Sequence, residues 1–128
     1  MTAFVPNSVI LYVSDVEAST TFYREILGHG PIKTYPGFSV FALSDDVTLG
    51  LQAAVEIEPT AGPYVGGTEL SLSNVERADV DRLHAQWKTL GIPMVLEPTV
   101  LEFGYTFVAT DPDGHRLRVC ATDTSSFV

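Results

Sequence analysis

Two charged side chains, Glu69 and Arg118, stand where the alternation of strand-like segments predicts a face turned away from the apolar core. A carboxylate there could act as a general base or metal ligand, and a guanidinium could clamp a carboxylate or phenolate. Cys120, the single cysteine, falls on the same face as Arg118. A thiol nucleophile needs a nearby base, and the sequence places neither His84 nor His115 to supply one, since both are predicted to be surface side chains. We therefore predict no catalytic residue.

These positions lie in a pattern that the chain contains twice. From Ser8 to Gln52 it reads as a strand, an amphipathic helix and three more strands, and the same order returns from Glu69 to Cys120. A half of this size cannot bury a core alone. We predict an α+β fold with two tandem βαβββ units, about 7–53 and 67–122, joined by a linker at 54–66 within a single domain, 1–128.

The helices are marked at their ends. Ser14 and Glu17 predict a capping box for the first helix, and Gly28 a left-handed C-cap. The second helix ends before Gly91 and carries an apolar stripe of Val80, Leu83, Trp87 and Leu90. Because Trp87 keeps the register of this stripe, we predict that it packs in the core instead of stacking on a ligand.

Alternation divides each strand into two faces, as in the first strand, where Val9, Leu11 and Val13 oppose Ser8, Ile10 and Tyr12. The apolar face should meet the helices, because burial of each large side chain stabilises by roughly 1.5–3 kcal/mol. The second face would then form the concave side of a curved mixed sheet, a cup with the helices outside, and a cup is suited to a small molecule. The alternative is that this face is simply solvated.

Composition excludes other classes of protein. The net charge is −9, and seven Lys and Arg are scattered through 128 residues, so we expect no nucleic-acid partner. No apolar run approaches the roughly 20 residues that span a bilayer, and no signal segment is visible at the start, so we expect no membrane association. One cysteine permits no internal disulfide, and a cytoplasmic location is expected.

The sequence resembles the vicinal oxygen chelate superfamily, which includes glyoxalase I, extradiol dioxygenases and bleomycin resistance proteins. The resemblance rests on Val-Ser-Asp-Val at 13–16, Thr-Thr-Phe-Tyr-Arg-Glu-Ile-Leu-Gly at 20–28 and Asp-Pro-Asp-Gly-His at 111–115. Segments 12–24, 103–107 and 111–120 are most similar to metal-free antibiotic-binding resistance proteins, particularly the type that sequesters phenazines. Such proteins are dimers that hold a planar ligand between aromatic rings.

Metal-dependent members of that superfamily carry a His or Glu on the first and fourth strands of each unit. The resemblance carries these positions onto Ser8, Gly50, Glu69 and Arg118, of which only Glu69 could bind a metal. It implies that the metal site is lost and that no cofactor is needed. It also implies that Glu69 and Arg118 lie within a few ångströms and form a charge-assisted hydrogen bond, which could be structural or could orient a ligand.

The resemblance further implies a pocket with aromatic walls, to which Tyr12, Phe103 and Tyr105 are assigned, with Phe38 as a further stacking ring. Gln52 stands where an aromatic residue is expected, and Phe41 and Phe107 are predicted to be core. The predicted ligand-binding residues are Ser8, Tyr12, Gly50, Gln52, Glu69, Phe103, Tyr105, Arg118 and Cys120.

Three functions remain open at this point. The first is a metal-independent binding protein, a homodimer, that sequesters a small aromatic antibiotic-like ligand. The second is an enzyme of the glyoxalase, lyase or dioxygenase kind, using metal ligands in another register or Glu69 as a base; a carboxylate beside an Arg is a weak base, which disfavours it. The third is a protein-interaction domain, which leaves the inward polar residues without a role.

Overall fold

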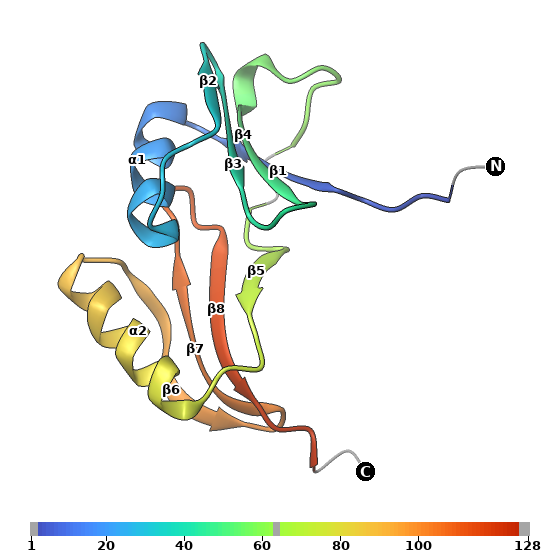
Figure 1. The fold of residues 1–128 in the computed structure, drawn as a ribbon. Helices are drawn as coiled ribbons and strands as arrows, with labels where there is room; N and C mark the ends of the chain where they lie inside the picture. Colours follow the sequence, from blue (N-terminus) through green and yellow to red (C-terminus); the bar gives the residue numbers. More distant parts are fainter. Residues whose placement is uncertain (1–2, 63–64, 126–128) are drawn as a thin grey trace. The chain divides into compact units, whose positions relative to one another are not determined.

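The structure is a computed structural model that describes residues 3–62 and 65–125. The chain divides into two compact units, residues 1–63 and 64–128, and the division falls inside the expected linker, 54–66. Each unit is a βαβββ motif with one helix and a four-stranded mixed sheet (Figure 1). The α+β class is therefore confirmed, whereas the cup formed by both units, and their union into a single domain, stay predictions.

Unit 1 consists of β1 (Ser8–Val13), α1 (Val16–Leu27), β2 (Lys33–Tyr35), β3 (Phe38–Ala42), β4 (Thr48–Ala53) and a short 3-10 helix (Ala54–Glu56). The sheet order is β1-β4-β3-β2. The first and fourth strands are parallel neighbours, and the other pairs are antiparallel. This topology brings the first and fourth strands together, the two strands on which the superfamily resemblance places its functional positions.

Unit 2 repeats the arrangement with β5 (Glu69–Leu72), α2 (Arg77–Thr89), β6 (Met94–Leu101), β7 (Gly104–Thr110) and β8 (Arg116–Thr122). Its sheet order is β5-β8-β7-β6, and β5 runs parallel to β8. In each unit the helix lies along one face of its own sheet (Figure 1). The other face is therefore open to a different use.

The helix ends agree with the sequence in part. The N-cap of α1 is Asp15, whose carboxylate accepts a hydrogen bond from the backbone N–H of Ala18 at 3.0 Å, so the capping box predicted from Ser14 and Glu17 is wrong. Ser14 and Asp15 are both residue types that favour an N-cap, and Asp15 takes this position because the backbone becomes helical only from Val16. The C-cap at Gly28 is confirmed, with φ of 78°.

The core of each unit lies between its helix and its sheet. In unit 1 it contains Leu11, Val13, Tyr23, Phe41, Leu49 and Leu51. In unit 2 Trp87 of α2 packs edge-on against Phe107 of β7, with ring centroids 5.4 Å apart. The predicted core roles of Trp87, Phe41 and Phe107 are confirmed. Leu90 is exposed because α2 ends one residue earlier, so the predicted stripe is one position too long.

The turn before β8 differs from expectation, since His115 is buried rather than at the surface. The Asp111 carboxylate accepts hydrogen bonds from the backbone N–H groups of Asp113 and His115, both at 2.9 Å. These bonds fold the Asp-Pro-Asp-Gly-His segment back on itself and turn His115 inward. The predicted surface location of His115 is therefore wrong, because the sequence pattern does not show that the Asp111 carboxylate bonds to the backbone of this turn.

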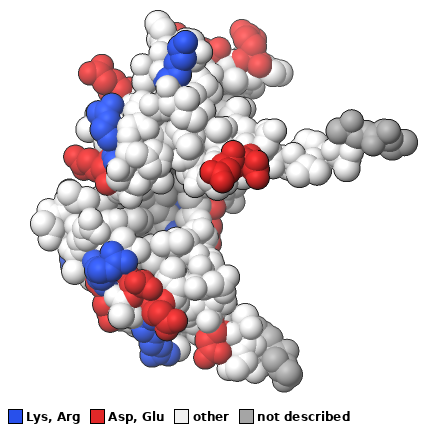
Figure 2. All heavy atoms as spheres, viewed as in Figure 1, with Lys and Arg blue, Asp and Glu red and all other residues white. Residues whose placement is uncertain are grey.

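Charge is dispersed on the face drawn in Figure 2, where Lys and Arg side chains are separated by uncharged and acidic ones. This face carries no basic stripe of the kind that follows a phosphate backbone. Within residues 3–62 and 65–125, no helix is long and apolar enough to cross a membrane.

Candidate functional site

The helix-free face of the unit 1 sheet carries a row of aromatic and polar side chains. Register pairs Tyr12 with Gln52, Gln52 with Phe38, and Phe38 with Tyr35, so one row crosses all four strands. Ser39, the neighbour of Phe38, bonds to α1, so Phe38 faces the other way. Tyr12 and Tyr35 are 41% and 52% exposed. The row presents rings at a surface, where single exposed aromatics are common but an aligned set is not.

Beside this row, Gly50 leaves a gap that the ring of Phe38 fills. A Cβ at Gly50 would lie 2.9 Å from Cζ of Phe38 and 3.3 Å from Cγ1 of Ile10. Contacts that short force a neighbour to move, so the ring occupies its position beside Gly50 only because no side chain is present there. Gly50 therefore acts as a platform for an aromatic ring.

The polar residues predicted for unit 1 lie on the same face. Ser8 Oγ accepts a hydrogen bond from Thr48 Oγ1 at 3.2 Å. Gln52 Nε2 donates to the carbonyl of its neighbour Ala53 at 3.1 Å, and the strand register places Gln52 between Tyr12 and Phe38 in the row. The predicted set Ser8, Tyr12, Gly50 and Gln52 thus shares one face of one sheet.

In unit 2 the predicted charge pair is present. Arg118 Nε donates to Glu69 Oε1 at 2.8 Å, and Arg118 Nη1 donates to Thr106 Oγ1 at 3.2 Å. The guanidinium carbon lies 5.2 Å from the ring centroid of Phe103. The side chains of Arg118 and Glu69 are 15% and 36% exposed, so the pair is partly shielded from water. The predicted charge-assisted hydrogen bond is confirmed, and Phe103 lies with it.

Tyr105 is not in this group. Its hydroxyl donates to the Asp81 carboxylate at 2.5 Å, and the Arg77 guanidinium lies 5.2 Å from its ring centroid. Both partners belong to α2, so Tyr105 shares the helix face with Phe107, opposite Thr106. Its placement beside Phe103 on the open face is therefore wrong. The hydrogen bond to Asp81 raises the pKa of the Tyr105 phenol.

Cys120 lies on the strand face of Arg118, as alternation predicts, and it is buried. Its register partner is Thr106, whose hydroxyl lies between the Val119 carbonyl, at 2.8 Å, and Arg118. A buried thiol beside a hydroxyl has the environment of a small core residue, and no base is present among these contacts.

The residues do not fit the metal site that some members of the resembled superfamily use. Gly50 has no side-chain ligand atom, and the ring of Phe38 occupies the space beside it, while Arg118 places a cation on the carboxylate of Glu69. A divalent ion at Glu69 would have to displace that guanidinium. Within residues 3–62 and 65–125, no three His, Cys, Asp or Glu side chains gather as a metal-binding group.

The sequence analysis did not predict two residues of the candidate site, Tyr35 and Thr106. Tyr35 joins the row because Pro36 and Gly37 form a two-residue turn that pairs Tyr35 directly with Phe38, and the Pro-Gly dipeptide is the signal that would have found it. Thr106 supports Arg118 from β7, and it could have been found from the register of β7 against β8.

Comparison with known proteins places this geometry in a family. The model of the glyoxalase/bleomycin resistance protein/dioxygenase superfamily matches residues 5–119. The chain belongs to this superfamily. A relative from Enterobacter agglomerans, the phenazine antibiotic resistance protein EhpR, is 37% identical over 121 residues, 92% of each chain. Membership confirms the resemblance stated from the sequence.

Solved structures agree with the fold. A protein from Agrobacterium tumefaciens with a solution NMR structure is 44% identical, with a TM-score of 0.85 over 94% of this chain and 99% of that one. A superfamily protein from Nocardioides is 22% identical, with a TM-score of 0.81 over 97% of this chain and 88% of that one. At that identity the second likeness concerns the fold alone.

Proposed function

We propose that this protein is a metal-independent small-molecule-binding protein that sequesters a planar aromatic ligand of the antibiotic kind. The observation that carries the proposal is the row of Tyr12, Gln52, Phe38 and Tyr35 across the helix-free face of unit 1. Similarity to a phenazine antibiotic resistance protein supports the same ligand class.

The row has the chemistry of a stacking surface. Aromatic pairs contribute about 0.5–1.5 kcal/mol beyond the burial of their area, and flat ligands gain from rings that are already held in place. Phe38 is held against Gly50, and Gln52 supplies one amide oxygen among the rings to orient a polar edge of the ligand. These features favour a flat, mostly apolar molecule with few polar groups.

On unit 2, Arg118 is proposed as a binding residue of the open face of that unit's own sheet. Two of its donors are engaged by Glu69 and Thr106, and the remaining N–H groups can reach an acceptor on a ligand. Because Glu69 already balances its charge, Arg118 suits a carbonyl or ring nitrogen better than it suits a free anion. Phe103, beside the guanidinium, is the apolar neighbour in this proposed site.

A binding role is favoured over catalysis because Glu69 is engaged by a cation. The Glu69 oxygen that accepts the hydrogen bond from Arg118 is already occupied, so a substrate proton would have to compete with the guanidinium for it. Metal independence rests on the same contact, since the guanidinium takes the place that an ion would need. An enzyme of this superfamily is the alternative.

Calorimetric titration with phenazine and a phenazine carboxylate tests the proposal. We expect saturable binding that Phe38→Leu and Tyr12→Leu each weaken about threefold to tenfold, the worth of one aromatic contact. Phe4→Leu is the matched control, because Phe4 is 92% exposed and lies before β1. Mass spectrometry should recover the ligand unchanged. Turnover, or affinity indifferent to the row, would overturn the proposal.

We also propose a cytoplasmic homodimer. Exposed apolar side chains on the helix-free face of unit 1, among them Ile10 and Tyr12, are costly to leave in water without a ligand or a second chain. In a two-fold dimer the same surface of each chain contacts its partner, so one interface would bury the exposed apolar side chains of both chains. Light scattering at several concentrations should give the mass of two chains, and the mass of one chain throughout would contradict it.

A further inference from the structure

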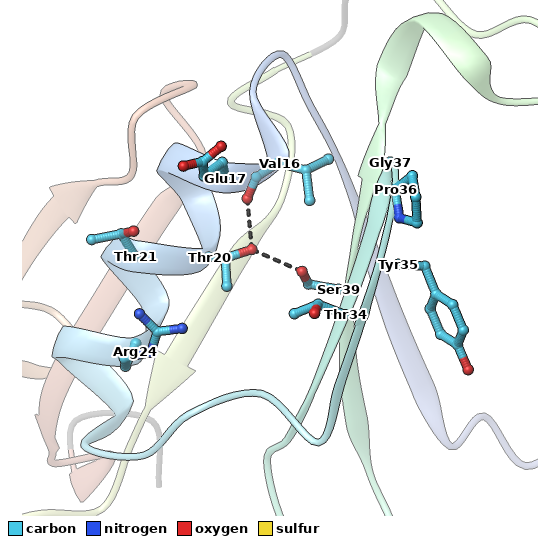
Figure 3. A pocket seen from close by; sticks show the side chains of 10 residues that line it. All are labelled: Val16, Glu17, Thr20, Thr21, Arg24, Thr34, Tyr35, Pro36, Gly37 and Ser39. Atoms are coloured by element: carbon cyan, nitrogen blue, oxygen red, sulfur yellow. Dashed lines mark hydrogen bonds between the residues drawn. The ribbon is translucent and has the colours of Figure 1, made fainter.

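A hollow lies on the helix side of unit 1, between α1 and the β2–β3 turn (Figure 3). Its volume is about 450 Å³, within the range of small-molecule sites. The ring of Tyr35 points away from α1, but Tyr35 also lines the hollow, so the hollow adjoins the aromatic row at this residue. Tyr12, Gln52 and Phe38, the other members of the row, do not line it. The proposed aromatic site does not use it.

The hydroxyls of Thr20 and Ser39 lie at the floor of the hollow, and the hydrogen bond between them has one possible direction. Thr20 Oγ1 lies 2.6 Å from the Val16 carbonyl oxygen and 2.8 Å from Ser39 Oγ. A hydroxyl has one hydrogen and a carbonyl can only accept, so Thr20 donates to Val16 and Ser39 donates to Thr20. Ser39 then keeps its lone pairs as acceptors at a buried position. The floor therefore favours a ligand that carries N–H or O–H donors.

The two ends of the hollow carry opposite charges. Glu17 and Arg24 lie seven residues apart on α1, with Thr20 between them (Figure 3). Seven residues make nearly two turns, so both side chains leave the same side of the helix, about 10 Å apart along its axis. Within residues 3–62 and 65–125, neither side chain has a hydrogen-bond or ion-pair partner.

We propose that this hollow binds a linear zwitterion whose ammonium and carboxylate groups lie about 10 Å apart, with the ammonium at Glu17 and the carboxylate at Arg24. An extended tripeptide has this length, since each residue spans about 3.4 Å. Its internal N–H groups face the acceptor of Ser39. A planar apolar ligand has no such charges, so the two sites take different classes of molecule.

Two-dimensional NMR titration of the full chain with triglycine tests this site. We expect saturable shifts at the amides of Thr20, Thr21 and Ser39, and none at Tyr12. Glu17→Gln and Arg24→Gln should each weaken binding about tenfold, the worth of one charge-assisted hydrogen bond.

The controls separate charge recognition from general surface binding. Glu25→Gln removes an exposed carboxylate of the same helix that does not line the hollow, and it should leave the affinity unchanged. N-acetylated triglycine amide, which lacks both charges, should not bind. Absence of saturable shifts with triglycine, equal binding of the capped peptide, or affinity unchanged in both variants would overturn the proposal.

Discussion

Arg118 reaches diagonally across the parallel strands β5 and β8 to bind Glu69. Register pairs Arg118 with Ser71, yet its Nε lies 2.8 Å from Oε1 of Glu69, two residues earlier on β5. Its Nη1 bonds to Thr106 on the other neighbouring strand. One guanidinium thus links three adjacent strands on the open face of unit 2. The contact means that one oxygen of the Glu69 carboxylate is already engaged by a cation.

Replacing Arg118 with Met should lower the free energy of unfolding by about 1–2 kcal/mol, because two hydrogen bonds from a partly shielded guanidinium are lost. Urea denaturation measures the change. Arg82→Met is the matched control, since the Arg82–Asp79 ion pair is more exposed to water and its loss should lower the free energy of unfolding by less. Equal losses in both variants would contradict a supporting role for the Arg118 network.

Gly50→Ala should cost about 1 kcal/mol of stability, because the new Cβ would lie 2.9 Å from the Phe38 ring and the ring must move. The cost should disappear when Phe38 is already Leu, which a double-mutant cycle by urea denaturation measures. Gly30→Ala is the control, since its Cβ would meet nothing closer than Arg24 Nε at 3.8 Å. Additive effects at Gly50 and Phe38 would refute the contact.

Tyr105→Phe should leave the affinity for the aromatic ligand unchanged, because Tyr105 lies on the helix face with Asp81. The hydrogen bond to Asp81 raises the pKa of the Tyr105 phenol above its usual value of 10.0. The stability that this hydrogen bond contributes is therefore present below pH 10.0 and is lost as the pH rises through the pKa of the folded protein. Ultraviolet titration of the wild type and variant should assign this late-titrating phenol. A lower affinity of the variant for the aromatic ligand would show that Tyr105 does contribute to binding.

Glu97 should make stability depend on pH at the acid end. The hydrogen bond from His84 is the main cause that holds the pKa of the Glu97 carboxyl below the usual 4.5, and the hydrogen bond from Lys88 is the second. Stabilisation from a lowered carboxyl pKa is present above pH 4.5 and is lost as pH falls through the folded value. In urea denaturation across that range, Glu97→Gln should lose stability less steeply than the wild type. Parallel pH profiles would show that the contact contributes nothing.

Purified protein that has been offered manganese, iron, nickel and zinc and then desalted should retain less than one ion per chain, because Arg118 occupies the carboxylate of Glu69. Elemental mass spectrometry gives the content directly. A tightly held ion in every chain would mean that other residues form a site, and an enzyme would become the leading function.

Local sequence patterns predicted each unit well. Alternation placed Leu11 and Val13 in the core and Tyr12 on the opposite face, because the side-chain period of a strand is two wherever the strand is paired. Alternation did not predict Tyr105, because the phase of β7 depends on where that strand starts against β8, and nothing local marks its first residue at Gly104. Phe103 and Tyr105 are two residues apart, so alternation assigns them to one face, but Phe103 precedes the first residue of β7 and does not follow the alternation of that strand.

The sequence by itself determined the two βαβββ units and the helix faces. These follow from composition and from periodicities of 2 and 3.6 residues, which are local. Only the tertiary structure decided that Phe38 covers Gly50, that Arg118 also bonds to Thr106, and that Tyr105 bonds to Asp81. Contacts between strands depend on register and on side-chain rotamers in a packed sheet, and neither quantity is encoded within one segment of chain.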